Sequence, residues 1–161
     1  MSVDGRILRG EGMEKIRKAE PKDCSRIAEI LIFNWRINFY PIFQDEAFYF
    51  KELEVASLAG QYANDAEYLN KLWVYDDGVV KGFIELEKSE LVKLYVDSFF
   101  QSRGIGAKLL AKAEASGATK LWALEKNVKA IKFYMRHGFM PTGEKKLEEG
   151  TEEYLICLRK K

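Results

Sequence analysis

The stretch that most constrains the fold is residues 71–97, KLWVYDDGVVKGFIELEKSELVKLYVD, in which three short β-rich runs follow one another. The first two runs are separated by Asp77-Gly78, a dipeptide that favours the tight turn of a β-hairpin. The third run follows the short turn at Ser89 and ends at Asp97. This pattern predicts an antiparallel pair of strands with a third strand after it.

Helices and further strands are expected on both sides of this block. A strand over residues 13–20 precedes a helix that opens at Glu20-Pro21 and continues through Trp35, because proline is favoured in the first helical turn. A second helix is expected from about Asp45 through Leu58. Downstream, the pattern predicts helices over residues 105–116 and 127–137, a strand over 119–125, and two strands around Glu149-Gly150. The order β-α-α-β-β-β-α-β-α-β-β indicates an α/β (mixed α+β) fold, with a mixed sheet of about six to seven strands and helices on both faces.

Composition favours one domain. The chain has 161 residues, of which 47% are hydrophobic, enough for one core but few for two. Residues 13–161 are expected to form this domain. Residues 1–12 are expected to be a disordered leader without chemistry, either a segment upstream of a natural start at Met13, an engineered remnant, or a loose native terminus.

Charge and cysteine content limit the partners. The 26 Lys and Arg balance 25 Asp and Glu, so neither nucleic acid nor a membrane is expected as a partner. Cys24 and Cys157 are far apart and have no ligand-spaced neighbours, which argues against a disulfide framework and a zinc site. The sequence carries no signal-peptide core and no transmembrane run, so the cytoplasm is the expected compartment.

The third strand leads into Gly104-Ile105-Gly106 at the start of a helix. Backbone N–H groups at a helix N-terminus have no partner within the helix, and the helix dipole favours an anion there. No Gly-Lys-Ser/Thr follows, and Leu109 stands where a dinucleotide fingerprint has its third glycine. The turn is therefore expected to hold an anion such as phosphate, with an ordinary tight turn as the alternative.

Two motifs give the chain a resemblance to a family. Residues 101–106, QSRGIG, match the Gln/Arg-x-x-Gly-x-Gly/Ala pyrophosphate loop of the GNAT family of acyl-coenzyme-A-dependent N-acyltransferases. Residues 127–139, NVKAIKFYMRHGF, resemble that family's Asn-x-x-Ala-x-x-Phe-Tyr-x-x-x-Gly-Phe segment. One departure is Ser98, where many members have proline. The resemblance implies a GNAT-like fold and direct transfer of an acetyl group from acetyl-CoA to a primary amine, without a metal or a covalent enzyme intermediate.

The resemblance also implies where the coenzyme is held. Amides of the loop would cradle its pyrophosphate, the backbone of residues 94–96 would pair with the pantetheine amides, and Asn127 would reach the pantetheine arm, with a helix N-cap as its alternative role. The expected coenzyme-binding residues are Leu94, Tyr95, Val96, Gln101, Ser102, Arg103, Gly104, Ile105, Gly106, Ala107, Asn127 and Ala130.

Tyr134 is the candidate acid for the departing thiolate of coenzyme A. It shares a helical face with Asn127, and its phenol can donate a proton or hydrogen bond to a thiolate whose conjugate acid has a pKa near ~8.5. Phe133 is expected to face the core. His137, in the last turn of the same helix, is most simply a cap of the helix dipole. A tyrosine buried for its ring is the alternative for Tyr134.

Glu90 is the candidate base, since it lies six residues before Val96 and resembles the base position of the histone-acetylating branch of the family. Strand alternation would put it on the face of Val92, Leu94 and Val96. An exposed strand-end glutamate is the alternative. The rival carboxylates are Glu85, Glu87, Asp97 and Glu125.

The aromatic stretch WRINFYPIF, residues 35–43, is the expected acceptor-binding segment, through Trp35, Phe39 and Tyr40, with packing of a helix pair on the sheet as its alternative. The acceptor amine stays open, and the chain is expected to be a monomer or homodimer. Two other interpretations of the sequence remain, a catalytically silent acyl-CoA-binding or sensing module and an unrelated phosphate-binding interaction domain.

Overall fold

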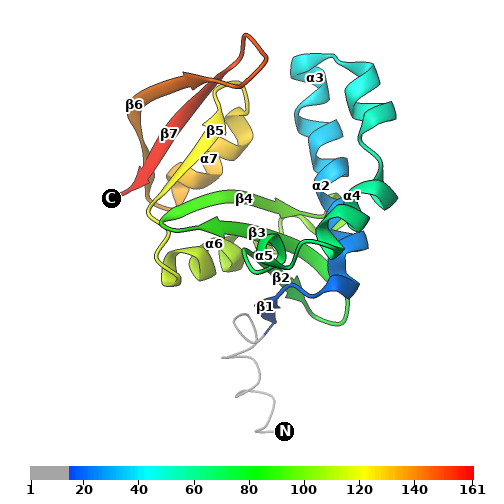
Figure 1. Ribbon diagram of the computed structural model, residues 1–161. Helices are drawn as coiled ribbons and strands as arrows, with labels where there is room; N and C mark the ends of the chain where they lie inside the picture. The colour runs from blue at the N-terminus through cyan, green and yellow to red at the C-terminus, as the bar shows by residue number, and fades with distance from the viewer. Residues whose placement is uncertain (1–14) are drawn as a thin grey trace, which may run out of the picture.

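A computed structural model describes residues 15–161 of the chain, so the expected leader and the start of the domain at Met13 lie outside the described residues. Within that range the chain forms a seven-stranded sheet in the order β1-β2-β3-β4-β5-β7-β6 (Figure 1). The strands are β1 (Ile16–Lys18), β2 (Leu72–Asp76), β3 (Val80–Glu87), β4 (Glu90–Val96), β5 (Lys120–Leu124), β6 (Phe139–Leu147) and β7 (Tyr154–Lys160). Neighbouring strands run antiparallel except β4 and β5, which are parallel. The mixed sheet expected from the sequence is confirmed.

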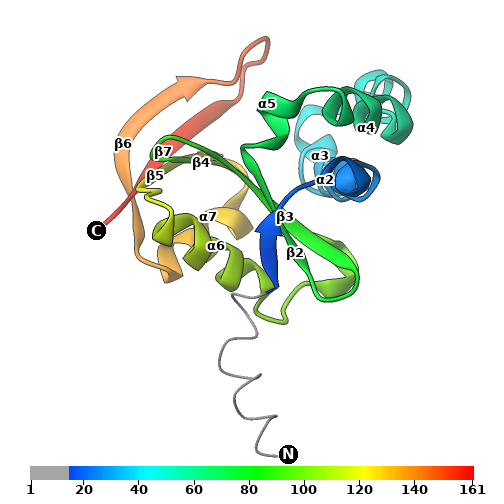
Figure 2. The same cartoon turned by 60° about the horizontal axis from the view of Figure 1, so that its bottom comes forward.

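Helices cover both faces of the sheet (Figure 2). They are the 3-10 helix η1 (Pro21–Asp23), α2 (Cys24–Asn38), α3 (Tyr40–Phe43), the π-helix η2 (Phe48–Glu52), α4 (Val55–Ala63), α5 (Ala66–Leu69), the 3-10 helix η3 (Ser98–Phe100), α6 (Ile105–Ala115) and α7 (Val128–Arg136). Helices α6 and α7 pack on one face through a core that includes Leu91, Val96 and Leu109. Helices α2, α4 and α5 pack on the other through Leu31 and Phe83.

The expected continuous helix from Asp45 through Leu58 is wrong. Leu53 and Glu54 have extended backbone (ψ 111° and 129°), and they separate the π-helix η2 from α4. Arg36 of α2 supplies a physical reason, because its guanidinium donates to the Tyr49 carbonyl at 2.8 Å and to the Leu53 carbonyl at 3.4 Å. Carbonyls of this segment therefore bond to a neighbouring helix, a tertiary contact that periodicity does not carry.

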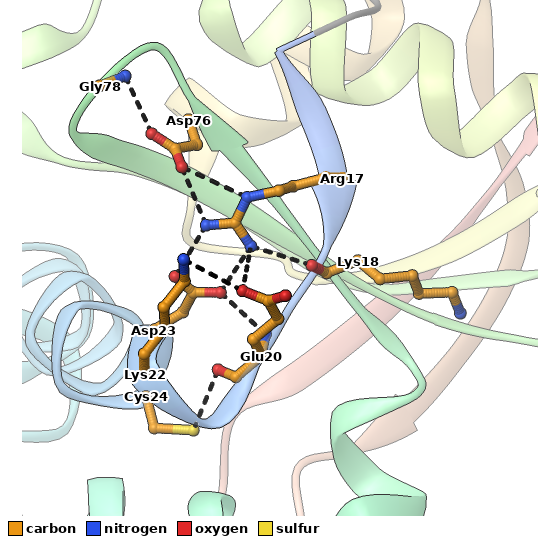
Figure 3. Close-up of polar contacts among 8 residues, drawn as sticks. All are labelled: Arg17, Lys18, Glu20, Lys22, Asp23, Cys24, Asp76 and Gly78. Carbon is orange, nitrogen blue, oxygen red and sulfur yellow. Dashed lines mark hydrogen bonds and ion pairs between the residues drawn. The ribbon is translucent and has the colours of Figure 1, made fainter.

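An ionic cluster ties the start of α2 to the edge of the sheet (Figure 3). The Arg17 guanidinium of β1 donates to both oxygens of Asp23, at 2.7 and 2.9 Å, and to Asp76 Oδ2 of β2 at 2.9 Å. The hydrogen bond to Asp23 raises the pKa of Arg17 most strongly, with a further rise from Asp76. Burial acts to raise the pKa of Asp23, but hydrogen bonds from Arg17 and from the Glu20 N–H outweigh it and hold that pKa below its usual value. The cluster therefore fixes where α2 begins.

Candidate functional site

The site lies where β4 and β5 separate. Their parallel pairing is limited to Glu90 with Lys120 and Leu91 with Leu121, and beyond Leu91 the strands diverge (Figure 1). Asp97 N–H donates to the Lys81 carbonyl of β3, so the alternation of an antiparallel ladder directs the N–H and C=O groups of Val96 and Leu94 away from β3. The end of β4 therefore presents backbone polar groups to the gap.

Two adjoining cavities occupy this region. The smaller, about 460 Å³, lies between the end of β4, the glycine loop and α7, and is called the loop cavity below. The larger, about 670 Å³, extends to the α3–η2 segment and the β6–β7 turn, and is called the hairpin cavity. Five residues line both cavities: Leu94, Tyr95, Asn127, Ala130 and Tyr134. The cavities therefore adjoin along these residues, and Tyr134 is one of them.

The glycine loop, residues 101–106, leads into α6 and leaves backbone N–H groups at the start of this helix without partners inside the helix. Gly104 (φ +83°) is the N-cap of α6, and Ser102 is also left-handed (φ +63°). Lys108 N–H donates to the Gly104 carbonyl at 3.1 Å, so the N–H groups of residues 105–107 precede the first bond of the helix. All three residues line the loop cavity. The loop can bind an anionic group there with its main chain.

A side chain at Gly106 would point at neighbouring protein atoms. A Cβ on Gly106 would lie 3.4 Å from Cζ of Phe133 on α7 and 3.9 Å from Cγ2 of Val96. The small residue therefore lets α6 approach α7 and β4, a reason that the motif alone does not reveal. Phe133 packs against the core, as expected, and also lines the loop cavity.

The expected coenzyme-binding residues come together, with one exception. Arg103 lines neither cavity, and its guanidinium lies 5.5 Å from the centroid of the Phe100 ring. The others line the loop cavity: Leu94, Tyr95, Val96, Gln101, Ser102, Gly104, Ile105, Gly106, Ala107, Asn127 and Ala130. Side chains that sequence reasoning missed also line it, notably Asn34 of α2 and Lys129 of α7.

Asn127 caps α7, since its Oδ1 accepts from the Ala130 N–H at 3.4 Å. This is the alternative role named from the sequence, and it leaves the side-chain amide N–H groups beside both cavities. At the other end of α7, His137 Nδ1 lies 2.8 Å from the Phe133 carbonyl, and Lys160 Nζ donates to the His137 carbonyl at 2.6 Å. His137 is thus part of the C-terminal cap of the helix.

Tyr134 is buried but reaches both cavities. Its ring packs against Phe133 and Phe139, with centroids 5.3 and 6.2 Å away. No side chain among residues 15–161 hydrogen-bonds to its hydroxyl. Burial raises the pKa of Tyr134 above its ordinary value, and the charge of Tyr95 adds to the rise. The phenol therefore remains protonated at neutral pH, as a hydrogen-bond donor must.

The expected alternation that joins Glu90 to Leu94 and Val96 is wrong. The register of β4 shifts, with Leu91 opposite Leu86 but Lys93 opposite Glu85, so Val92 is an extra, bulged residue. Leu91 and Leu94 consequently share the core face beneath α6 and α7. Glu90 falls on the opposite face, although it still lines the hairpin cavity.

The rival carboxylates are held elsewhere by ion pairs, and none lines either cavity. The pairs are Glu85 with Lys93, Glu87 with Lys71, Asp97 with Arg26 and Glu125 with Lys145. Sequence reasoning missed Asp45 before η2 and Glu148 and Glu149 in the β6–β7 turn, which do line the hairpin cavity. Of the described side chains, none makes an ion pair with these three or with Glu90.

The aromatic stretch contributes in part. Trp35 and Phe39 line the hairpin cavity, and Trp35 Nε1 donates to the Tyr95 hydroxyl at 3.0 Å. Tyr40, in contrast, lines neither cavity, and its ring packs edge-on against Phe50 with a centroid distance of 4.9 Å. Tyr49 takes its place in the wall. Burial raises the pKa of Tyr49, and the charges of Asp45 and Glu148, which line the same cavity, raise it further.

Residues 15–161 contain neither a membrane-spanning helix nor a metal cluster. None of the helices there has the length and the apolar character needed to cross a membrane. Within the same range, no group of three or more His, Cys, Asp or Glu side chains is arranged to hold a metal ion.

Comparisons with known proteins agree with this geometry. Residues 69–141 match the acetyltransferase (GNAT) domain family. A spermidine N(1)-acetyltransferase of Thermoplasma acidophilum is 25% identical over 140 residues, covering 78% of this chain and 87% of that protein.

Solved structures share the fold. An N-acetyltransferase from Staphylococcus aureus Mu50 superposes with a TM-score of 0.70 at 19% identity, over 89% of this chain and 98% of the other. A PaiA N-acetyltransferase from T. acidophilum, solved in complex with coenzyme A, superposes with a TM-score of 0.63 at 20% identity, over 89% and 97% of the two chains.

Proposed function

We propose that the chain is a GNAT-type N-acyltransferase that transfers an acetyl group from acetyl-CoA to a primary amine, because residues 69–141 match the acetyltransferase (GNAT) domain family and a spermidine N(1)-acetyltransferase is 25% identical to it. The observation that carries the proposal is that the two cavities adjoin along residues that include Tyr134. The loop cavity takes the coenzyme, with its pyrophosphate at the N–H groups of residues 105–107 and its pantetheine arm along the end of β4. The hairpin cavity takes the amine.

The reaction is a direct displacement. The amine nitrogen attacks the thioester carbonyl carbon, the new C–N bond forms, and the C–S bond breaks to release the thiolate of coenzyme A. Tyr134 donates its phenolic proton, or a hydrogen bond, to that sulfur. Its burial suits the hydrogen bond rather than full proton transfer, because the raised pKa keeps the phenol protonated while the side chain lines both cavities.

An amine with a pKa near ~10.4 must lose a proton before it attacks, which at pH 7 costs roughly 4.6 kcal/mol. Glu90 is the carboxylate of β4 that lines the acceptor cavity, and we propose that it takes this proton through water. The bulge at Val92 turns Glu90 away from the face of Leu94, which supports a relay rather than direct contact.

Charge and aromatic rings support a cationic acceptor of the polyamine class. Four carboxylates line the hairpin cavity, Asp45, Glu90, Glu148 and Glu149, against two lysines. Lys93 is neutralised by Glu85 at 3.2 Å, and Lys146 lies 4.2 Å from the centroid of the Trp122 ring. The name of the Thermoplasma relative, a spermidine N(1)-acetyltransferase, agrees with this class. An ammonium distant from the reacting amine would be held by the carboxylates of the β6–β7 turn.

Thiol release from acetyl-CoA, measured with spermidine and with a monoamine of similar length, tests the function. Release that requires an amine is expected, with spermidine the better acceptor. Tyr134→Phe should lower kcat by roughly 10²-fold while coenzyme affinity stays within a few-fold, because only the donor is removed. A variant with unchanged kcat would contradict the role of Tyr134, and no release with any amine would contradict the function.

Acceptor binding has its own test. Glu148→Gln should raise the KM for spermidine about two- to fivefold, the range for a partly exposed charge pair, and change the KM for the monoamine less. Glu152→Gln is the matched control, since Glu152 lies in the same turn, is exposed and lines neither cavity. Glu90→Gln should instead lower kcat near neutral pH, with partial recovery as rising pH deprotonates the amine by itself. Equal effects of Glu148→Gln and Glu152→Gln would refute the anchoring role.

A further inference from the structure

Asn34 is a buried polar side chain to which the mechanism above gives no role. It lies within α2, is 4% exposed and lines the loop cavity but not the hairpin cavity. Its Nδ2 donates to the Ile30 carbonyl at 2.8 Å and to the Val96 carbonyl at 3.0 Å. Both acceptors are carbonyl oxygens, so the nitrogen of the carboxamide must be the atom that faces them, and Oδ1 must be the other.

The Asn34 Oδ1 atom is left as a hydrogen-bond acceptor. No N–H or O–H group of residues 15–161 donates to it. Over the same residues, every fully buried side-chain nitrogen or oxygen has a partner, so Oδ1 must retain accessible surface. Because Asn34 as a whole is buried and the loop cavity is the one it lines, that surface opens into the loop cavity.

The backbone carbonyl of Val96, which could otherwise accept a hydrogen bond from a ligand in the loop cavity, already has two hydrogen-bond donors. Val96 directs its C=O into the gap beside β4, but that oxygen accepts from Asn34 Nδ2 at 3.0 Å and from Gln101 Nε2 at 3.1 Å. A carbonyl oxygen has two lone pairs, and both are used. The sequence predicts that the backbone of residues 94–96 pairs with the pantetheine amides. At Val96 the carbonyl oxygen is already bonded to Asn34 and Gln101, and the free acceptor beside it is the Asn34 Oδ1.

We infer that Asn34 is a coenzyme-binding residue whose Oδ1 accepts a hydrogen bond from an amide N–H of the pantetheine arm. The inference rests on the proposed binding of coenzyme A in the loop cavity. Pantetheine has two secondary amides, each with one N–H to satisfy when water is excluded. The two bonds made by Nδ2 hold the carboxamide in one orientation, so its acceptor is already aimed at the cavity before the ligand arrives.

Calorimetry with two ligands separates this role from a merely structural one. Asn34→Ala should weaken binding of coenzyme A about three- to tenfold, the range for one neutral hydrogen bond. It should leave binding of adenosine 3′,5′-bisphosphate, which lacks the pantetheine arm, unchanged. Gln101→Ala is the contrast, because it removes a donor that anchors the glycine loop to Val96 and should weaken both ligands.

Coenzyme analogues in which one amide N–H is replaced by CH₂ complete the test. Wild type should lose affinity for one of the two analogues, and Asn34→Ala should bind that analogue and coenzyme A equally well. Equal weakening of coenzyme A and the bisphosphate by Asn34→Ala would overturn the inference. If Asn34→Ala does not fold, equal affinity of wild type for coenzyme A and both analogues overturns it. Wild type that binds no coenzyme A would overturn the proposed function instead.

Discussion

Gly82 of β3 offers the sharpest test of the packing that supports the site. A Cβ at this position would lie 2.9 Å from the Tyr95 carbonyl oxygen and 3.0 Å from Cδ1 of Leu109. The first atom is backbone of β4, and the second belongs to a fully buried side chain of α6. Neither can move alone, so alanine would push α6 away from the sheet.

Overpacking of a tight core costs about 1–3 kcal/mol, and contacts this short favour the upper part of that range. The smaller unfolded-state entropy of alanine returns about 0.4–1 kcal/mol. We therefore expect Gly82→Ala to lower the free energy of unfolding by about 2 kcal/mol and the melting temperature by about 4–8 °C. Because α6 carries the loop, affinity for coenzyme A should fall as well.

Thermal unfolding followed by circular dichroism is the assay. Gly60→Ala is the control, since Gly60 lies in α4, where an added Cβ would have no atom of residues 15–161 within 4 Å apart from its chain neighbours and the backbone of its own helix. Alanine gains up to ~1 kcal/mol of helix propensity there. The same chemical change should thus raise the melting temperature at position 60 and lower it at position 82. A melting temperature of Gly82→Ala equal to or above that of the parent would refute the reasoning.

Two other substitutions follow from named contacts. Gly106→Val should weaken coenzyme A binding at least tenfold, about 1.4 kcal/mol, because the added methyl groups would displace Phe133. Gly106→Ala is the control, since its Cβ would meet that ring at 3.4 Å and the variant should keep most of the affinity. Equal affinities of the valine variant and wild type, measured by calorimetry, would contradict this prediction. Asp23→Asn should cost about 1–3 kcal/mol at pH 7, since it removes the negative charge and replaces one of the two oxygens that accept from Arg17 with an NH₂ group. The lowered folded pKa of Asp23 means that its stabilisation is present above about pH 4 and is lost as pH falls through the folded pKa, so urea unfolding should show the two proteins converging at low pH. A gap that persists or widens there would show that Asp23 acts through packing instead.

Local patterns identified most of the elements and half of the site. The Asp77-Gly78 turn, the strand ending at residue 96 and the helix after Gly104 were readable because turn residues and side-chain periodicity act over a few neighbours. The loop N–H groups follow from the same local order of strand, glycine turn and helix. The residues that line the loop cavity were therefore largely accessible from the sequence.

Contacts between distant segments were not readable in the same way. The bulge at Val92 reverses the face of Glu90, and Arg36 binds the carbonyls around η2. Neither feature can be predicted from the periodicity of hydrophobic residues, because each depends on a partner residue from another helix or strand. Asn34 resembles any other polar residue on a helix until the fold brings Val96 beside it.

The α/β class, the glycine loop and the helix that carries Asn127 and Tyr134 can be predicted from the amino-acid sequence, since each depends on residues adjacent along the chain. The residues that face them across the two cavities depend on long-range packing. The separation of β4 from β5 after two pairs opens the gap. The approach of the β6–β7 turn to the α3–η2 segment brings the charge of Glu148 close enough to raise the pKa of Tyr49, about a hundred residues away in sequence. Charges, cavities and unsatisfied acceptors arise from such long-range packing, which no local pattern encodes.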